Sequence, residues 1–183
     1  MRYSTVAIAL HWLIAALVAF ELGTGISFGR FDPGDSFFFP SAYAMHMSVG
    51  IALLVCSVLR VAWRLMHRSP PLPQGMGLAS RALAHASHTL LYVYILAVPF
   101  TGWVVLSARR KPVLLFDGVH WPTLPWISNL AHPNRTLIHE AALPTHIWLS
   151  YAGIGLIVLH VVAALYHHFY KRDDVLRRML PGA

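Results

Sequence analysis

Histidine is the residue type with the greatest capacity for chemistry in this chain of 183 residues, which contains twelve of them. Imidazole binds metals and exchanges protons near neutral pH. Because 57% of the residues are hydrophobic and only 11% are charged, most of these histidines fall within or at the ends of long apolar segments. Ionisable side chains are costly inside a membrane, so each of these histidines is a functional candidate.

His146 and His160 are the most informative pair, because they are fourteen residues apart in one apolar segment. Fourteen residues make about four helical turns, so both imidazoles leave the same helix face, separated by about 21 Å along its axis. Two ligands on one face at two depths are suited to two stacked cofactors.

The elements that position these histidines are four apolar stretches, each long enough for the roughly 20 residues of a membrane-spanning helix. They cover approximately residues 6–28, 42–66, 82–107 and 146–170. Strand alternation is absent, and a soluble domain would carry about 25% charged residues. The sequence therefore predicts an all-α transmembrane four-helix bundle formed by a single domain, residues 1–183, with the first span retained.

Turns and loops separate the spans. We expect one turn at Asp32-Pro33-Gly34-Asp35 and a stiff connection at Ser69-Pro70-Pro71-Leu72-Pro73. Between the third and fourth spans lie roughly forty residues that include Pro112, Pro122, Pro125 and Pro133, a length that usually indicates function or disorder. Trp121 and Trp126 in this loop favour a cap at the membrane interface.

The Lys and Arg residues of the loops predict that both chain termini are cytoplasmic, because the cytoplasmic side of a membrane protein is enriched in these residues. With the N-terminus inside, nine lie inside and five outside. The inner ones are Arg2, Arg60, Arg64, Arg68, Arg81, Lys171, Arg172, Arg177 and Arg178, and the outer ones are Arg30, Arg109, Arg110, Lys111 and Arg135.

Each histidine of the pair then has a partner at its own depth. The second span enters from outside, which places His46 level with His146, and the first enters from inside, which places His11 level with His160. Zinc prefers four ligands in one cluster, whereas a haem iron takes one imidazole from each side. We therefore expect two haem b groups, held without thioether links because there is only one cysteine. His85 and His88 are rivals to His11 as the inner ligand.

Other residues share these faces. Arg60 lies fourteen residues after His46 and is placed to bind a haem propionate, unless it extends to the inner headgroups. Gly50 and Gly153 would let a flat macrocycle approach the backbone, or allow close helix packing. His167, two turns after His160, is placed to contact a quinone together with His88, or is an interfacial histidine.

A run of three cations, Arg109, Arg110 and Lys111, lies on the outer side against the general charge bias. Headgroup binding or solubility would account for it. The functional alternative is electrostatic steering of a small anion towards the outer haem.

At this point several segments resemble the bacterial cytochrome b561 family. They are Ala9-Leu10-His11-Trp12-Leu13, Met45-His46-Met47-Ser48-Val49-Gly50-Ile51, Leu83-Ala84-His85-Ala86-Ser87-His88, Leu159-His160 and Tyr166-His167-His168-Phe169-Tyr170-Lys171-Arg172-Asp173. Members of this family are di-haem b proteins of the bacterial inner membrane, similar to the cytochrome b subunits of hydrogenases and formate dehydrogenases. The resemblance covers nearly the whole chain and departs most in the loop between the third and fourth spans.

The resemblance implies His11 and His160 as ligands of the inner haem and His46 and His146 as ligands of the outer haem. A stand-alone member oxidises periplasmic superoxide and reduces ubiquinone, so we expect a multi-pass inner-membrane oxidoreductase with superoxide and quinone as partners and no nucleic acid. One alternative is an electron-transfer subunit that serves a separate dehydrogenase or periplasmic redox partner. Another is a transporter whose histidines relay protons.

Overall fold

The computed structural model describes residues 2–27, 40–67, 70–71, 76–116 and 118–182. Within them, four helices are long and apolar enough to cross a membrane. They are α1 (Thr5–Ser27), α2 (Pro40–Met66), α3 (Leu78–Ala108) and α5 (His132–Tyr166). The predicted all-α transmembrane bundle is therefore confirmed. The turn expected at residues 32–35 lies outside the described residues, as does most of the connection at residues 69–73.

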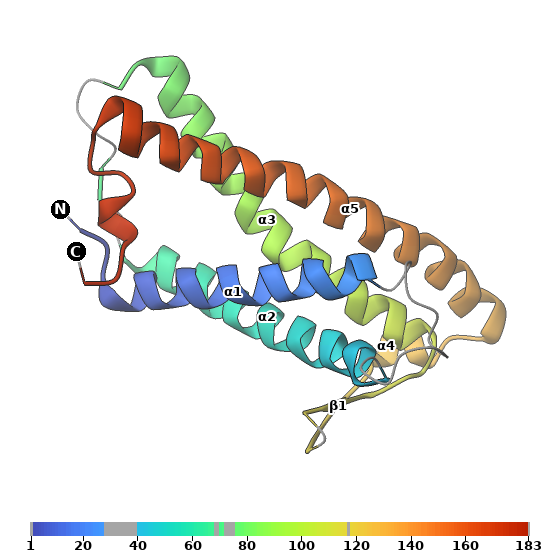
Figure 1. The fold of residues 1–183 in the computed structure, drawn as a ribbon. Helices are drawn as coiled ribbons and strands as arrows, with labels where there is room; N and C mark the ends of the chain where they lie inside the picture. Colours follow the sequence, from blue (N-terminus) through green and yellow to red (C-terminus); the bar gives the residue numbers. More distant parts are fainter. Residues whose placement is uncertain (1, 28–39, 68–69, 72–75, 117, 183) are drawn as a thin grey trace.

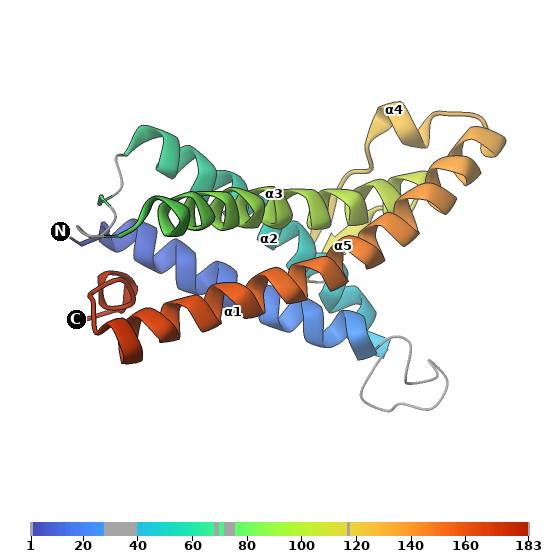
Figure 2. The ribbon, with the colours of Figure 1, turned by 90° about the horizontal axis from the view of Figure 1, so that it is seen from above.

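The bundle is built from neighbouring helix pairs, with α1 packed on α2, α2 on α3 and α3 on α5. Both chain termini lie at one end, which we call the terminal end, while α4 (Pro125–Ser128) lies at the opposite end (Figures 1 and 2). We call that opposite end, formed by residues 109–116 and 118–131, the cap end. The two ends therefore correspond to the two predicted sides of the membrane.

The fourth spanning helix begins at His132 and not near His146, so the preceding connection is much shorter than the sequence indicates. Pro133 occupies the first helical turn, where a missing N–H removes no hydrogen bond. The added turns carry polar residues such as Arg135 and Glu140, which is why hydropathy alone does not detect them. Pro144 is accommodated inside the helix.

The cap is a small folded unit. Strand β1 (Val113–Leu115) pairs antiparallel with β2 (Val119–Trp121), with Leu114 opposite His120. The buried Ser107 hydroxyl accepts the Leu124 N–H at 2.9 Å and donates to the Trp103 carbonyl at 2.7 Å, which joins the cap to α3. A core cluster of Ala108, Leu124 and Ile127 lies beneath it.

The main core cluster lies midway along the bundle and consists of Ile14, Val18, Leu53 and Ile95. Its position along the helices is between the level of His11 and that of His46. The bundle therefore has an apolar layer between its two histidine levels.

The chain finishes at the terminal end. The π-helix η1 (His167–Lys171) continues α5, and the 3-10 helix η2 (Arg177–Met179) follows. Trp12 donates its indole N–H to the Met179 carbonyl at 2.7 Å, and Arg178 donates to the Pro71 carbonyl at 2.7 Å. The C-terminal segment thus connects α1 with the link between α2 and α3.

Candidate functional site

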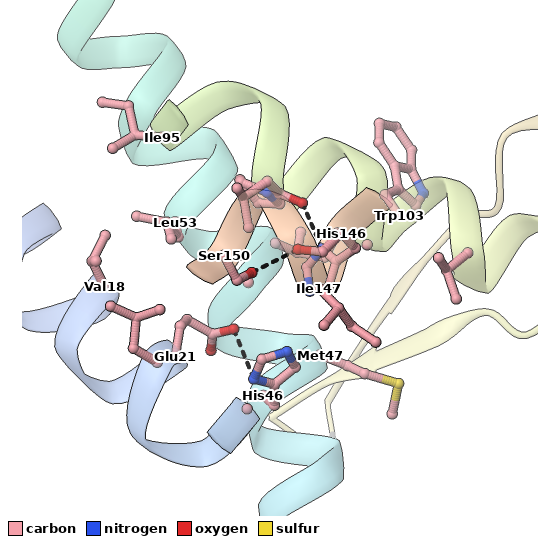
Figure 3. A pocket seen from close by; sticks show the side chains of 18 of the residues that line it. Val18, Glu21, His46, Met47, Leu53, Ile95, Trp103, His146, Ile147 and Ser150 are labelled. Carbon is pink, nitrogen blue, oxygen red and sulfur yellow. Dashed lines mark hydrogen bonds and ion pairs between the residues drawn. The ribbon is translucent and has the colours of Figure 1, made fainter. Parts of the chain in front are cut away.

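The cap-end histidine pair comes from α2 and α5. The ring centres of His46 and His146 are 6.3 Å apart, and the ring planes are 88° to each other. Both rings line a cavity of about 440 Å³ that residues from all four long helices enclose (Figure 3). This volume falls in the range of cofactor pockets, roughly 300–1,000 Å³.

Each imidazole of this pair is held through its Nδ1 atom. His46 Nδ1 donates to Glu21 Oε2 at 3.0 Å (Figure 3). The same nitrogen lies 2.9 Å from Thr24 Oγ1. His146 Nδ1 donates to the Val98 carbonyl at 2.9 Å. Metal-ligating histidines usually donate their second ring N–H to a carboxylate or a carbonyl. This arrangement directs ligation through Nε2 of both rings.

Glycines on the neighbouring helices make room for these rings. A Cβ atom on Gly102 would lie 3.3 Å from His146 Cε1, and one on Gly25 would lie 3.5 Å from His46 Cε1. Gly153 fits the second of its two expected roles, because a Cβ there would overlap the Tyr94 ring at 1.9 Å. Close helix packing therefore accounts for Gly153. At Gly50 the neighbour is the Glu21 carboxylate, 3.4 Å away.

The terminal-end histidines form a group of three. The ring centres of His11 and His160 are 6.2 Å apart, and those of His88 and His160 are 5.7 Å apart. His85 is exposed on α3, as is His88. His160 therefore has two neighbours at ligand-pair distance, and His88 remains the rival to His11.

Arg60 lies at this same level and reaches back to α1. Its Nη1 donates to the Ala7 carbonyl at 3.0 Å, and its Nη2 lies 3.4 Å from His11 Nδ1. The guanidinium also lies over the Tyr92 ring, 5.8 Å from the ring centre. A fixed positive charge at this depth suits a carboxylate ligand such as a haem propionate.

Both levels fit a haem iron with two axial imidazoles. A metal–imidazole bond of about 2 Å on each side, plus roughly 1 Å from each nitrogen to its ring centre, predicts about 6 Å between ring centres. The separations of 6.2 Å and 6.3 Å agree with that value. His46 and His146 would hold a haem at the cap end, and His11 and His160 at the terminal end.

His167 lies in the π-helix at the terminal end. Its Nδ1 atom donates to Asp173 Oδ2 at 2.5 Å, and the Asp173 N–H returns to the His167 carbonyl at 3.2 Å. Arg172 between them adopts a left-handed conformation, with φ of 52°. π-Helical turns occur frequently at functional sites. Sequence reasoning identified His167 but missed Asp173, which holds it.

The three cations that follow α3 make different contacts. Arg110 donates through Nε to the Ser128 carbonyl at 2.7 Å, which fixes the cap. Lys111 Nζ lies 4.9 Å from the centre of the Tyr43 ring, which lines the cap-end cavity. Arg109 lines a separate cavity of about 290 Å³ together with Arg135, His132 and His139.

The comparisons with known proteins cover nearly the whole chain. The family model described as prokaryotic cytochrome b561 matches residues 2–182. Similar proteins include "Cytochrome b561 homolog 2" of Escherichia coli, 33% identical over 98% of this chain and 91% of that protein. "Probable superoxide oxidase CybB" of Yersinia pestis is 29% identical, over 98% of this chain and 96% of that protein. "Cytochrome b562" of Cereibacter sphaeroides is 26% identical, over 97% of this chain and 94% of that protein.

Such coverage leaves no long segment of the chain outside the similarity, and it includes every histidine described above. The helices that cross the membrane are the elements on which the candidate haem ligands lie. The chain therefore belongs to the prokaryotic cytochrome b561 family, as a bacterial membrane oxidoreductase that uses haem b for transmembrane electron transfer.

Proposed function

We propose that the protein oxidises superoxide at the cap end and reduces ubiquinone at the terminal end. The protein would span the bacterial inner membrane, with the cap end facing the periplasm and both termini facing the cytoplasm. The observation that carries this proposal is the presence of two histidine pairs at opposite ends of one bundle, with ring centres 6.3 Å and 6.2 Å apart. With a haem held by each pair, the protein would have one electron carrier near each membrane surface.

Haem b, when bound, supplies a one-electron Fe(III)/Fe(II) couple. Two imidazoles at each level would hold the haem iron from both sides, which favours electron transfer over oxygen binding. Each superoxide ion gives up one electron and leaves as dioxygen. Ubiquinone takes two electrons and two protons, so two superoxide ions are consumed for each quinol formed.

The cap end is suited to attract a small anion. Lys111 lies beside Tyr43 at the cavity that contains His46 and His146, while Arg109 and Arg135 lie together on the adjoining surface. Positive charge around a cleft raises the local concentration of an anionic substrate and its rate of association. The name of the Yersinia pestis relative supports superoxide as that anion.

The terminal end is suited to quinone reduction, which requires proton donors. Asp173 binds the His167 imidazole through Nδ1, so Nε2 is the nitrogen that would contact a quinone. Imidazole titrates near neutral pH and can deliver a proton to a quinone carbonyl. His88, beside His160, is a second polar contact on α3.

Stopped-flow spectroscopy of the purified protein tests this function. We expect superoxide to reduce the haem rapidly, and added ubiquinone to reoxidise it, with no partner protein present. Haem that stays oxidised under superoxide would contradict the proposed substrate. Reduction by superoxide without reoxidation by quinone would contradict the proposed acceptor.

A second candidate is an electron-transfer subunit that docks a separate dehydrogenase or a periplasmic redox protein. The exposed apolar side chains of the cap favour it, since Trp126 is 67% exposed and Phe116 57% exposed. Exposed apolar groups of this kind occur at protein interfaces and at membrane surfaces. Failure of the isolated protein to react with superoxide would favour this function.

A further inference from the structure

The two histidine pairs differ in the charge that touches them. At the cap end, Glu21 Oε2 lies 3.0 Å from His46 Nδ1. At the terminal end, the Arg60 guanidinium lies 3.4 Å from His11 Nδ1. An acidic group thus contacts one proposed ligand, and a basic group contacts a proposed ligand of the other pair.

Glu21 is placed inside the bundle rather than at its surface. Its side chain is 12% exposed, and its second oxygen, Oε1, is buried without a hydrogen-bond partner among the described residues. Among the described residues that line the cap-end cavity, it is the one Asp, Glu, Lys or Arg side chain. An acidic residue at this depth in a spanning helix is costly unless it serves a function.

A carboxylate that accepts the second N–H of a metal-ligating imidazole makes that imidazole a stronger donor to the metal. Stronger donation and nearby negative charge both stabilise the ferric state, which carries one more positive charge than the ferrous state. A guanidinium favours the ferrous state for the opposite reason. These effects are large in an interior of low dielectric constant, where water does not screen them.

We infer that Glu21, acting through His46, holds the cap-end haem at a lower reduction potential than the terminal-end haem, and that Arg60 raises the potential of the latter. Electron transfer from the cap end to the terminal end is then downhill. This inference rests on the haem placement in the proposed function, but it requires neither superoxide nor quinone. Glu21 is a positioning residue in this account, because it acts through His46.

Redox titration of the purified holoprotein, followed by its haem absorption bands, measures both potentials. We expect two one-electron components, of which His46→Ala removes the lower. Glu21→Gln keeps the side-chain size and replaces the carboxyl group with an amide. In this variant the potential of the lower component should rise by about 59 mV or more, which is at least a tenfold change in its equilibrium constant. The upper component should stay unchanged. Arg60→Gln should lower the upper component alone.

Thr24→Val is the matched control, because Thr24 Oγ1 lies 2.9 Å from the same His46 nitrogen and carries no charge. It should shift the lower component much less than Glu21→Gln. If Glu21→Gln does not retain the cap-end haem, the titration is performed on Glu21→Asp instead. The shorter side chain withdraws the carboxylate from Nδ1, so the lower component should rise in the same direction by a smaller amount.

An unchanged potential of the lower component in these Glu21 variants would overturn the inference. The inference would also be overturned if both components shifted equally in Glu21→Gln, or if Thr24→Val shifted the lower component as much as Glu21→Gln does. Such a result would leave the superoxide reaction of the proposed function intact. Conversely, the expected shifts in a protein that does not react with superoxide would support the inference and remove the proposed substrate.

Discussion

The cap-end imidazoles are each fixed by an acceptor on a neighbouring helix. Glu21 on α1 accepts from His46 on α2, and Val98 on α3 accepts from His146 on α5. Thr24 and Thr101 add a hydroxyl within 3.1 Å of each Nδ1 atom. These contacts orient both rings before a cofactor binds, which reduces the entropy lost on binding.

Single-ligand variants test the assignment of the four histidines. We expect His46→Ala or His146→Ala to remove the cap-end haem and spare the other, because the iron lacks one axial ligand. His11→Ala or His160→Ala should do the reverse. The haem content measured by pyridine haemochrome analysis should fall from two haems per chain to one in each case.

The comparison of His11→Ala with His88→Ala decides the terminal-end ligand. Both rings lie close to His160, at 6.2 Å and 5.7 Å between ring centres. If His88→Ala loses the terminal-end haem and His11→Ala retains it, the assignment to α1 is wrong.

Gly102→Ala tests the space around His146. The added Cβ would lie 3.3 Å from His146 Cε1, so the ring must shift from its position. Overpacking of this kind costs about 1 kcal/mol or more, or roughly fivefold in haem affinity. Haem dissociation measured by transfer to an apoprotein acceptor reports the change.

Gly155→Ala is the control on α5, because a Cβ there meets nothing within 4 Å. It should leave haem dissociation unchanged. If Gly102→Ala retained haem as well as the parent protein, the His146 ring would not need the space beside Gly102.

Sequence reasoning placed the four proposed ligands on levels that the structure also shows, because helical periodicity fixes both face and depth. It missed Glu21, although an acidic residue within the predicted span of residues 6–28 was a visible signal. The Val98 carbonyl gives no comparable signal, since a backbone acceptor leaves no trace in residue type. The contact of Gly102 with His146 depends on how α3 and α5 pack.

At the scale of elements, the start of α5 shows where hydropathy fails. The segment from His132 to Thr145 is helical but contains Asn134, Arg135 and Glu140, so it does not resemble a span. Prolines at positions 133 and 144 also indicate a loop. In the structure, the first lies in the initial turn, and the helix accommodates the second.

The π-helical end of α5 predicts a specific defect for His167→Ala. Removal of the imidazole that Asp173 orients should slow quinone reduction while haem content and superoxide reactivity stay normal. The variant's haem reoxidation by quinone, measured by stopped-flow spectroscopy, tests this. His168→Ala, at the next position of the same π-helix, is the control. Quinone reduction at the parental rate in His167→Ala would remove this role.

The cations at the end of α3 predict a reaction that slows with salt. Replacement of Arg109, Arg110 and Lys111 by glutamine should lower the rate of haem reduction by superoxide about tenfold at low ionic strength, and flatten its dependence on salt. The structure further predicts that Lys111→Gln affects the rate more than Arg110→Gln, since Arg110 is bound to Ser128.

A matched triple variant at the terminal end, with Arg81, Lys171 and Arg177 replaced by glutamine, should keep the parental rate and salt dependence. A rate independent of salt in the parent protein would exclude steering. A cap variant as fast as the parent would shift the assignment towards the electron-transfer subunit.

At the scale of the whole molecule, the main core cluster among the described residues is small. The main cluster has four buried residues and lies between the two histidine levels. Bound cofactors would therefore supply much of the packing at each level. A ligand that binds only the folded state stabilises it, by an amount that grows with the logarithm of the ratio of its concentration to its Kd.

We expect purified protein to contain two low-spin haem b groups per chain, extractable with acidic acetone, and to lose thermal stability as haem is depleted. Protein expressed under haem limitation should unfold at a lower temperature than the fully loaded protein in the same detergent. Unfolding temperatures independent of haem content would show that the helices pack without the cofactor.

Helix α5 contributes one candidate ligand to each level, whereas the partners come from two different helices. If these residues hold two haems, a single helix would set the spacing of the two irons, and thermal motions between helices would change it little. Electron tunnelling falls steeply with distance, so a fixed spacing keeps the transfer rate uniform. The same helix restricts evolution: one residue inserted between His146 and His160 would rotate the two rings by about 100° relative to each other. The interval between them can tolerate substitutions but not changes of length.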